Sequence, residues 1–312
     1  MDAHGTLRAG HRAAPARRRT AGGRRQRAVH RVPMSFLVPS TLLCFGLLLG
    51  PSLLGAGYAF TDWDGLTSPG WIGLGNFREF LTEPEGRGVL LHTMVLTVLY
   101  VVGVNAVGLG LALGLARSLK TRNVLRTVFF LPAVVSPLVV AYVWKYILDA
   151  GGPLNEALRA GGLGAAAHPW LGSPATALLM VVVVMVWQFS GLHMLIYMAG
   201  LQGVQTEVLE AAAVDGAGAW RSFRHVTLPL LLPSVMVGTV LSTILAFMAF
   251  DQVMALTGGG PSGASETLGT YVYKQAFVTG RYGYSAAVAL LLVVLVFAVC
   301  FVQVRLLRSR SR

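Results

Sequence analysis

An acidic and alanine-rich stretch interrupts the apolar chain between residues 201 and 234, which read LQGVQTEVLEAAAVDGAGAWRSFRHVTLPLLLPS. Glu210 is followed there by three alanines, and Asp215 is followed by a glycine and an alanine. We expect a short helix capped by Thr206, then a turn at Gly216, where glycine accepts positive φ without steric cost, and then a second short helix. Small side chains flanked by carboxylates form a compact surface that fits a partner's groove, so the chemistry indicated is docking.

The second short helix carries two aromatic residues three positions apart. Trp220 and Phe223 should share one face of this helix. Arg221 and Arg224 should point away from that face. Pro229 should end the segment and lie in the first turn of the apolar helix that follows. The plainer alternative is an ordinary amphipathic surface loop that binds no partner.

Motifs for covalent chemistry are missing from the sequence. It contains no GxxxxGK[ST] phosphate cradle, no GxSxG elbow and no HExxH pair. The run Gly258-Gly259-Gly260-Pro261 lacks the lysine and the strand-to-helix setting of a phosphate cradle, so we reject that interpretation. The seven histidines have no metal-ligand spacing, and both cysteines lie inside apolar runs, where they are expected to act as small apolar residues. We therefore expect no catalytic residue, no metal site and no cofactor bound by this chain.

The elements that position these residues are membrane helices. A chain of 312 residues that is 54% hydrophobic and only 12% charged is not an ordinary soluble domain. Recurring apolar runs of about twenty residues predict membrane spans, so the fold class is an all-α integral membrane protein. Pro132 and Pro137 should kink or break the third span. The six predicted spans are residues 33–57, 89–116, 125–148, 174–200, 229–250 and 285–304.

The positive charge follows the predicted topology. Most of the 25 lysine and arginine residues fall in the arginine-rich tail 1–32, the loop 117–126, the Glu210 loop and the C-terminal tail. Excess positive charge stays on the cytoplasmic side, so both termini and the Glu210 loop are expected inside the cell. The net charge of +12 is thereby explained without a nucleic-acid role.

Three regions follow from this interpretation. Residues 1–32 are a basic tail with too few large apolar residues to form a core, and we expect this tail to be disordered. It serves either as a topology determinant or as an anchor on anionic lipid. Residues 33–305 form the six-span domain, with a loop at 201–228 between spans four and five, and residues 306–312 form a second basic tail.

The pattern Glu-Ala-Ala-x-x-Asp-Gly-Ala, followed by Phe, a β-branched residue and Leu-Pro, resembles the cytoplasmic loop of permease subunits in binding-protein-dependent ABC importers. In that family the loop contains the coupling helix, which docks into the ATPase subunit. The resemblance implies the same docking role for the matching residues. These are Glu210, Ala211, Ala212, Asp215, Gly216, Ala217, Phe223, Val226, Leu228, Pro229 and Pro233.

Other segments resemble the carbohydrate branch of the same family, related to the maltose and glycerol-3-phosphate permeases. They are residues 73–81, similar to a short helix at the lipid edge, residues 126–144, and residues 250–277, similar to an outer loop. The resemblance implies a second, distinct permease subunit, two ATPase subunits that bind Mg-ATP, and an extracytoplasmic solute-binding protein. It places the chain in the cytoplasmic membrane as a transport subunit that is not itself an enzyme.

Polar side chains inside the spans are candidates for the solute path, because sugars need hydrogen-bonding amides and hydroxyls plus an aromatic face. The alternative for each is a bond between helices. The polar candidates are Asn105, Gln188, Ser190, His193, Thr239, Ser242 and Thr243, with Asp251 and Gln252 at the outer mouth, and the aromatic candidates are Trp187 and Tyr197.

Two other classes of function remain open. A self-sufficient channel or secondary carrier usually has ionisable residues deep in its spans, and none is found here, since Lys145 and Asp251 lie at outer ends. A membrane scaffold without transport would leave the Glu210 pattern unexplained.

Overall fold

The computed structural model describes residues 37–116 and 120–310, which divide into two compact units at Pro51 and Ser52. The whole of the predicted tail 1–32 and its boundary with the first span therefore lie outside the described residues. In the first unit, α1 (Leu37–Leu43) continues into the π-helical η2 (Cys44–Leu49). Apart from one bridge between Thr61 and Trp71, the described residues form helices, turns and loops, which confirms the all-α class.

Four helices among the described residues are long and apolar enough to cross a membrane. They are residues 38–58, which include α2 (Gly50–Tyr58), α4 (Pro84–Ala116), α8 (Pro174–Leu201) and α15 (Tyr282–Arg310). Two bent pairs pass the same length and composition test together. The first joins α5 (Arg122–Val134) to α6 (Pro137–Ile147), and the second joins Ala219–Leu230 to α12 (Leu232–Phe247). The six predicted spans correspond to these four helices and two pairs.

The third predicted span, residues 125–148, is not one continuous helix. Its halves α5 and α6 meet at 98°. Val135 and Ser136 have extended backbones (ψ 142° and 132°), and Pro137 begins α6. A residue before proline is pushed out of the α-helical region by the proline ring, so the break falls at Ser136. Pro132, by contrast, lies inside α5 and does not end it.

The fifth predicted span also differs at its start. Pro229 lies in α11 (Leu228–Leu230), and a bend of 71° separates that segment from α12. Pro233 is the proline in the first turn of α12. The expectation that Pro229 lies in the first turn of the membrane helix is therefore wrong, because Pro229 lies before the bend and α12 begins after it.

Short helices occupy the segments between spans. The segment similar to a lipid-edge helix forms α3 (Gly75–Thr82), held by buried Asn76, which donates to the carbonyls of Ala59 and Thr61. Residues 149–173, between the third and fourth predicted spans, contain α7 (Pro153–Ala160) and η3 (Gly164–Ala166). Buried Asn155 organises this loop, because its amide donates to three backbone carbonyls and accepts from Trp170 Nε1 at 2.9 Å.

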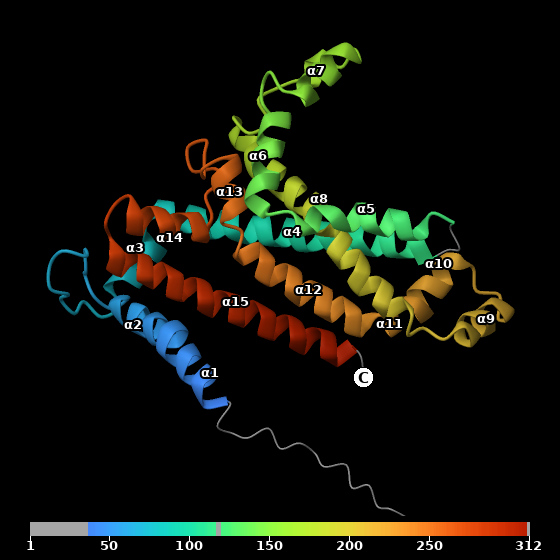
Figure 1. The fold of residues 1–312 in the computed structure, drawn as a ribbon, viewed down its shortest axis with the longest axis horizontal. Coiled ribbons are helices and arrows are strands. Elements are labelled where there is room, and N and C mark those ends of the chain that lie inside the picture. The colour runs from blue at the N-terminus through green and yellow to red at the C-terminus, as the bar shows by residue number, and fades with distance from the viewer. Residues whose placement is uncertain (1–36, 117–119, 311–312) are drawn as a thin grey trace, which may run out of the picture. The chain divides into compact units, whose positions relative to one another are not determined.

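The second unit is built around α4 and α8, which lie side by side, with α5 and α12 packed against them and α15 against α12 (Figure 1). The helices α13 (Asp251–Leu256) and α14 (Leu268–Phe277) complete it. Gly108 permits the contact between α4 and α8, since a Cβ there would lie 2.6 Å from His193 Cβ. Gly110 and Gly114 lie on the same helix, yet nothing lies within 4 Å of a Cβ at either position.

Candidate functional site

The Glu210 loop forms a helical hairpin. α9 (Thr206–Val214) turns at residues 215–218 into α10 (Ala219–Ser222), which continues as the π-helical η4 (Phe223–Thr227) and α11. Figure 1 places this hairpin beyond the C-terminal end of α8, near the C-terminal end of α4, whereas α3 and α14 lie near the N-terminal end of α4. The hairpin and the α3–α14 end are thus separated by the length of a membrane helix.

The turn of the hairpin depends on one glycine. Gly216 has φ of 75°, a conformation that a side chain disfavours. Its N–H donates to the Ala213 carbonyl at 3.1 Å, and the Ala217 N–H donates to the Ala212 carbonyl at 3.0 Å. These two bonds form the glycine-terminated helix end known as a Schellman motif. The prediction that Gly216 breaks the helix is confirmed.

The start of α9 differs from the sequence-based expectation. The capping position is Gln205, whose backbone is extended (φ −66°, ψ 134°), and no side chain caps the helix. Thr206 is the first helical residue, so the prediction that it caps α9 is wrong. Glu207 lies in the first turn, where negative charge suits the helix dipole.

The surface of the hairpin combines carboxylates with exposed apolar groups. No residue of α9 is buried, and Glu210 and Asp215 are exposed. Val214 is 87% exposed and Trp220 is 70% exposed. The Trp220 and Phe223 rings lie 5.7 Å apart, which confirms their predicted common face. Exposed aromatic and aliphatic side chains beside charges are typical of protein interfaces.

The hairpin is joined closely to the two helices that flank it. Gly200 lies in the last turn of α8, and a Cβ there would overlap Ser234 Oγ and lie 2.9 Å from the Leu231 side chain. Leu231 is fully buried at the bend between α11 and α12. The two ends of the loop are therefore packed against each other, where α8 ends and α12 begins.

A hydrogen-bonded cluster links α4, α8 and α12. Asn105 Nδ2 donates to Ser242 Oγ at 2.9 Å, and Tyr197 Oη donates to Asn105 Oδ1 at 2.5 Å. Both Ser242 and Thr243 bond the Thr239 carbonyl on their own helix. These sequence-predicted residues come together, and each is paired within the chain.

Gln188 stabilises the break between α5 and α6. Its Nε2 donates to the Val135 carbonyl at 3.1 Å, a carbonyl that the break leaves outside the helix, and its Oε1 accepts from Gln252 Nε2 at 3.4 Å. A broken helix at membrane depth needs such partners for its freed backbone groups. Gln188 and Gln252 are thus brought together, whereas Asp251 is exposed at the start of α13.

The remaining candidates are more scattered. His193 is fully buried and its Nδ1 bonds the Phe189 carbonyl at 3.1 Å. Trp187 is 45% exposed and packs edge-on against Trp144. With Ser190, Trp187 borders an apolar groove of about 680 Å³ between α4, α5 and α8.

Comparison with known proteins decides the family. Residues 106–312 match the family of binding-protein-dependent transport system inner membrane components. The chain belongs to this family. It is 32% identical over 277 residues to the probable starch degradation products transport system permease protein AmyD of Thermoanaerobacterium thermosulfurigenes, covering 88% of this chain and 94% of the relative. It is 34% identical over 274 residues to the multiple sugar-binding transport system permease protein MsmF of Streptococcus mutans, covering 87% of this chain and 93% of MsmF.

The fold of this permease matches solved ABC transporters. It superimposes on a chain of a bacterial ABC transporter involved in the import of the polysaccharide alginate with a TM-score of 0.76 and 21% identity, covering 89% of this chain and 95% of the other. At this identity the likeness establishes the fold. The chain is therefore a membrane-spanning permease subunit of an ABC transporter, a class of protein that is not itself an enzyme.

Sequence reasoning missed two features of this permease. The first is Val214, which occupies a position that the Glu210 pattern leaves undefined and is exposed beside Asp215. An apolar residue on an otherwise polar helix face was the signal that could have indicated this exposure. Gly191 of α8 packs directly against α5, since a Cβ there would overlap the Phe129 carbonyl. Gly191 and Gly200 of α8 are nine residues apart, a spacing that forms no small-residue motif from which that contact could be predicted.

Proposed function

We propose that this permease is one half of the translocation pathway of an ATP-driven importer for a sugar or sugar-like solute. The family supports ATP-driven import, and the names of AmyD and MsmF support a carbohydrate solute. The single observation that carries the proposal is the exposed Glu210 hairpin, which bears the importer pattern and joins α8 to α12 where Gly200 packs against Leu231 and Ser234.

In this proposal the hairpin docks a separate ATPase subunit. The chain has no phosphate cradle of its own, so Mg-ATP is bound and hydrolysed by two partner ATPase subunits. The carboxylates of Glu210 and Asp215 and the exposed apolar surface of Val214 and Trp220 form the docking face. When the ATPase subunits close, the hairpin moves with them, and the contact between Gly200 and Ser234 carries that motion into α8 and α12.

The rest of the assembly follows the family. A second, distinct permease forms the other half of the pathway, and an extracytoplasmic binding protein delivers the solute. This proposal is supported by a solved structure of similar fold, a bacterial alginate ABC transporter in complex with a periplasmic protein that holds an alginate pentasaccharide. The distribution of arginine and lysine supports a multi-pass protein of the cytoplasmic membrane with both termini and the hairpin inside.

The solute path is proposed to use the polar residues named from the sequence. Trp187 and Asp251 have surface that a solute or a second permease can reach, whereas Ser190 is buried at the edge of the apolar groove and its hydroxyl donates to the Trp187 carbonyl. Asn105, Tyr197, Ser242 and Gln188 are paired with other groups of the chain, at ~0.6 kcal/mol for a typical bond of this kind within a membrane. Such weak bonds can be exchanged for bonds to a sugar hydroxyl when the helices move.

Purification from native membranes tests the assembly. An affinity-tagged chain should bring down a second permease and an ATPase, and the complex should hydrolyse ATP, whereas the purified chain alone should not. The fully isolated chain is the control for contaminating ATPase. Recovery of a lone oligomer that transports solute without ATP would instead establish the alternative, a self-sufficient channel or secondary carrier.

A further inference from the structure

A polar pocket of about 420 Å³ lies at the end of α4 opposite the Glu210 hairpin. Its volume falls within the ~300–1,000 Å³ that is usual for small-molecule sites. None of its residues has a role in docking or in the proposed solute path. The lining consists of Glu85, Gly88, Val89 and His92 on the first turns of α4, Ser262, Gly263 and Glu266 in the loop before α14, and Lys274 on α14.

The loop that forms one wall of the pocket is held by internal hydrogen bonds. Ser265 is fully buried, and its Oγ lies 2.8 Å from Thr257 Oγ1 and 2.6 Å from the Gly260 carbonyl. Thr257 Oγ1 also accepts from the Gly259 N–H at 3.2 Å. The loop is therefore a fixed wall and does not need to be ordered by a ligand.

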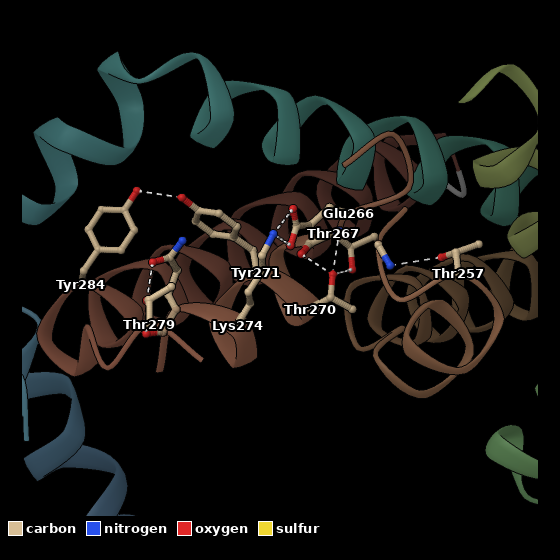
Figure 2. Close-up of polar contacts among 10 residues, drawn as sticks. Thr257, Glu266, Thr267, Thr270, Tyr271, Lys274, Thr279 and Tyr284 are labelled. Carbon is tan, nitrogen blue, oxygen red and sulfur yellow. Dashed lines mark hydrogen bonds and ion pairs between the residues drawn. The ribbon is translucent and has the colours of Figure 1, made fainter. Parts of the chain in front are cut away.

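A second set of bonds fixes this loop to the two helices. Thr267 and Thr270 form a reciprocal capping box at the start of α14 (Figure 2). The Leu268 N–H donates to Thr93 Oγ1 of α4 at 2.9 Å. All three walls are thus connected by buried hydrogen bonds, so the pocket is preorganised, a condition that lowers the cost of binding.

The chemical groups in the pocket are of both charges. Glu266, whose side chain is only 5% exposed, pairs with Lys274 Nζ at 3.4 Å (Figure 2). Burial raises the pKa of Glu266, although the neighbouring Lys274 charge opposes the shift. His92 Nδ1 is buried and has no hydrogen-bond partner. The His92 ring therefore lines the pocket while its Nδ1 is enclosed by the protein, and the Glu266 carboxylate beside it is already paired.

This mixture selects for a neutral ligand with hydroxyl groups. An anion would be repelled by the carboxylates of Glu85 and Glu266, and a cation would meet the Lys274 ammonium. A hydroxyl both donates and accepts, so vicinal hydroxyls can donate to a carboxylate and accept from the ammonium. Val89 is the single aliphatic side chain in the lining, which leaves little room for an apolar ligand.

We infer that this pocket is an outer loading site for a neutral sugar ring or polyol, occupied before the solute enters the membrane-spanning part of the path. The inference rests on the proposed sugar import, and on the Glu210 hairpin lying inside the cell, which puts the opposite end of α4 outside.

A cysteine in the pocket tests the loading site. Gly88 lines the pocket on α4, and nothing lies within 4 Å of a Cβ there, so Gly88→Cys should fold normally. Cys44 and Cys300 are first replaced by serine, and the assembled importer is placed in nanodiscs. The rate of modification by a charged methanethiosulfonate is then measured with maltose, raffinose or glycerol, without binding protein. At least one of these probes should slow the reaction by ~5-fold or more at saturation.

Two comparisons make the result specific to the pocket. Ser68→Cys, in an exposed loop outside the pocket, should react at the same rate with and without sugar. Adding Lys274→Met to Gly88→Cys should reduce the protection by sugar. If Lys274→Met fails to assemble, Glu85→Gln replaces it, since Glu85 offers an acceptor to the same ligand.

The outcomes separate this site from the proposed function. ATP-driven uptake of a probe that gives no protection of Gly88→Cys would overturn the loading site and leave the importer proposal intact. Protection without any uptake would support the site and contradict the importer. Protection by the binding protein alone, without sugar, would show a docking surface and also overturn the loading site.

Discussion

Replacing Glu210 by lysine should leave the permease in the membrane but abolish binding of the ATPase and ATP-driven uptake. Glu210 is exposed on α9 and is in neither of the ion pairs found among the described residues, so the fold should not change. Removing one partner of a charge pair buried in an interface costs ~2–5 kcal/mol, which predicts roughly 30-fold or more weaker association. Co-purification with the ATPase and uptake into proteoliposomes measure the two losses.

The matched control is Glu156→Lys, the same change of charge on an exposed residue of α7, far along the sequence from the hairpin. This variant should retain the ATPase. Normal uptake by Glu210→Lys, at membrane levels equal to those of the unchanged protein, would contradict the docking role of the hairpin.

Among glycine-to-alanine substitutions in the packed helices, Gly191→Ala should lower the stability of the protein most. A Cβ at this position of α8 would overlap the Phe129 carbonyl of α5 and lie 2.8 Å from Phe130 Cα. Backbone atoms cannot rotate away as a side chain can, so α5 and α8 must separate. Overpacking of this kind typically costs ~1–3 kcal/mol and here should reach the upper end. A lower unfolding temperature in detergent and loss of the monodisperse fraction are the expected readouts.

Gly110→Ala provides the comparison on α4. It adds the same methyl group to a helix interior, and no atom lies within 4 Å of the new Cβ. Because alanine is a better helix former by about 1 kcal/mol, this variant should be neutral or slightly stabilised. An unfolding temperature for Gly191→Ala equal to that of Gly110→Ala would show that α5 and α8 do not pack as described.

Hydropathy and proline positions predicted much of the fold. The apolar runs located the spans because a bilayer requires about twenty apolar residues, and Pro137 correctly predicted an interrupted third span, whereas Pro132 does not interrupt α5. The angle of 98° between α5 and α6 could not be predicted from the sequence. The break between them is stabilised by the bond from Gln188 to the Val135 carbonyl, and these two residues are 53 positions apart in sequence. Helix α7 was missed because glycine and proline around it indicated only a loop.

The candidate site was predictable to different extents. The Glu210 hairpin follows from local rules, and Gly216 ends α9 as a positive-φ glycine should. The partner of each polar residue inside the spans was not predictable, because α8 is apolar on nearly all sides and its sequence does not reveal which face meets α4. Hence Asn105, Tyr197 and Ser242 were named separately as candidates, although in the fold they form one hydrogen-bonded cluster.

The sidedness of residue 210 tests the central claim most directly. The measurement uses Glu210→Cys in a chain whose two native cysteines, Cys44 and Cys300, are replaced by serine, and a maleimide that cannot cross membranes. The account predicts labelling in inside-out vesicles stripped of the ATPase, protection when the ATPase is added back, and no labelling of intact cells. Labelling of intact cells from outside, or an inside rate unaffected by the ATPase, would contradict it.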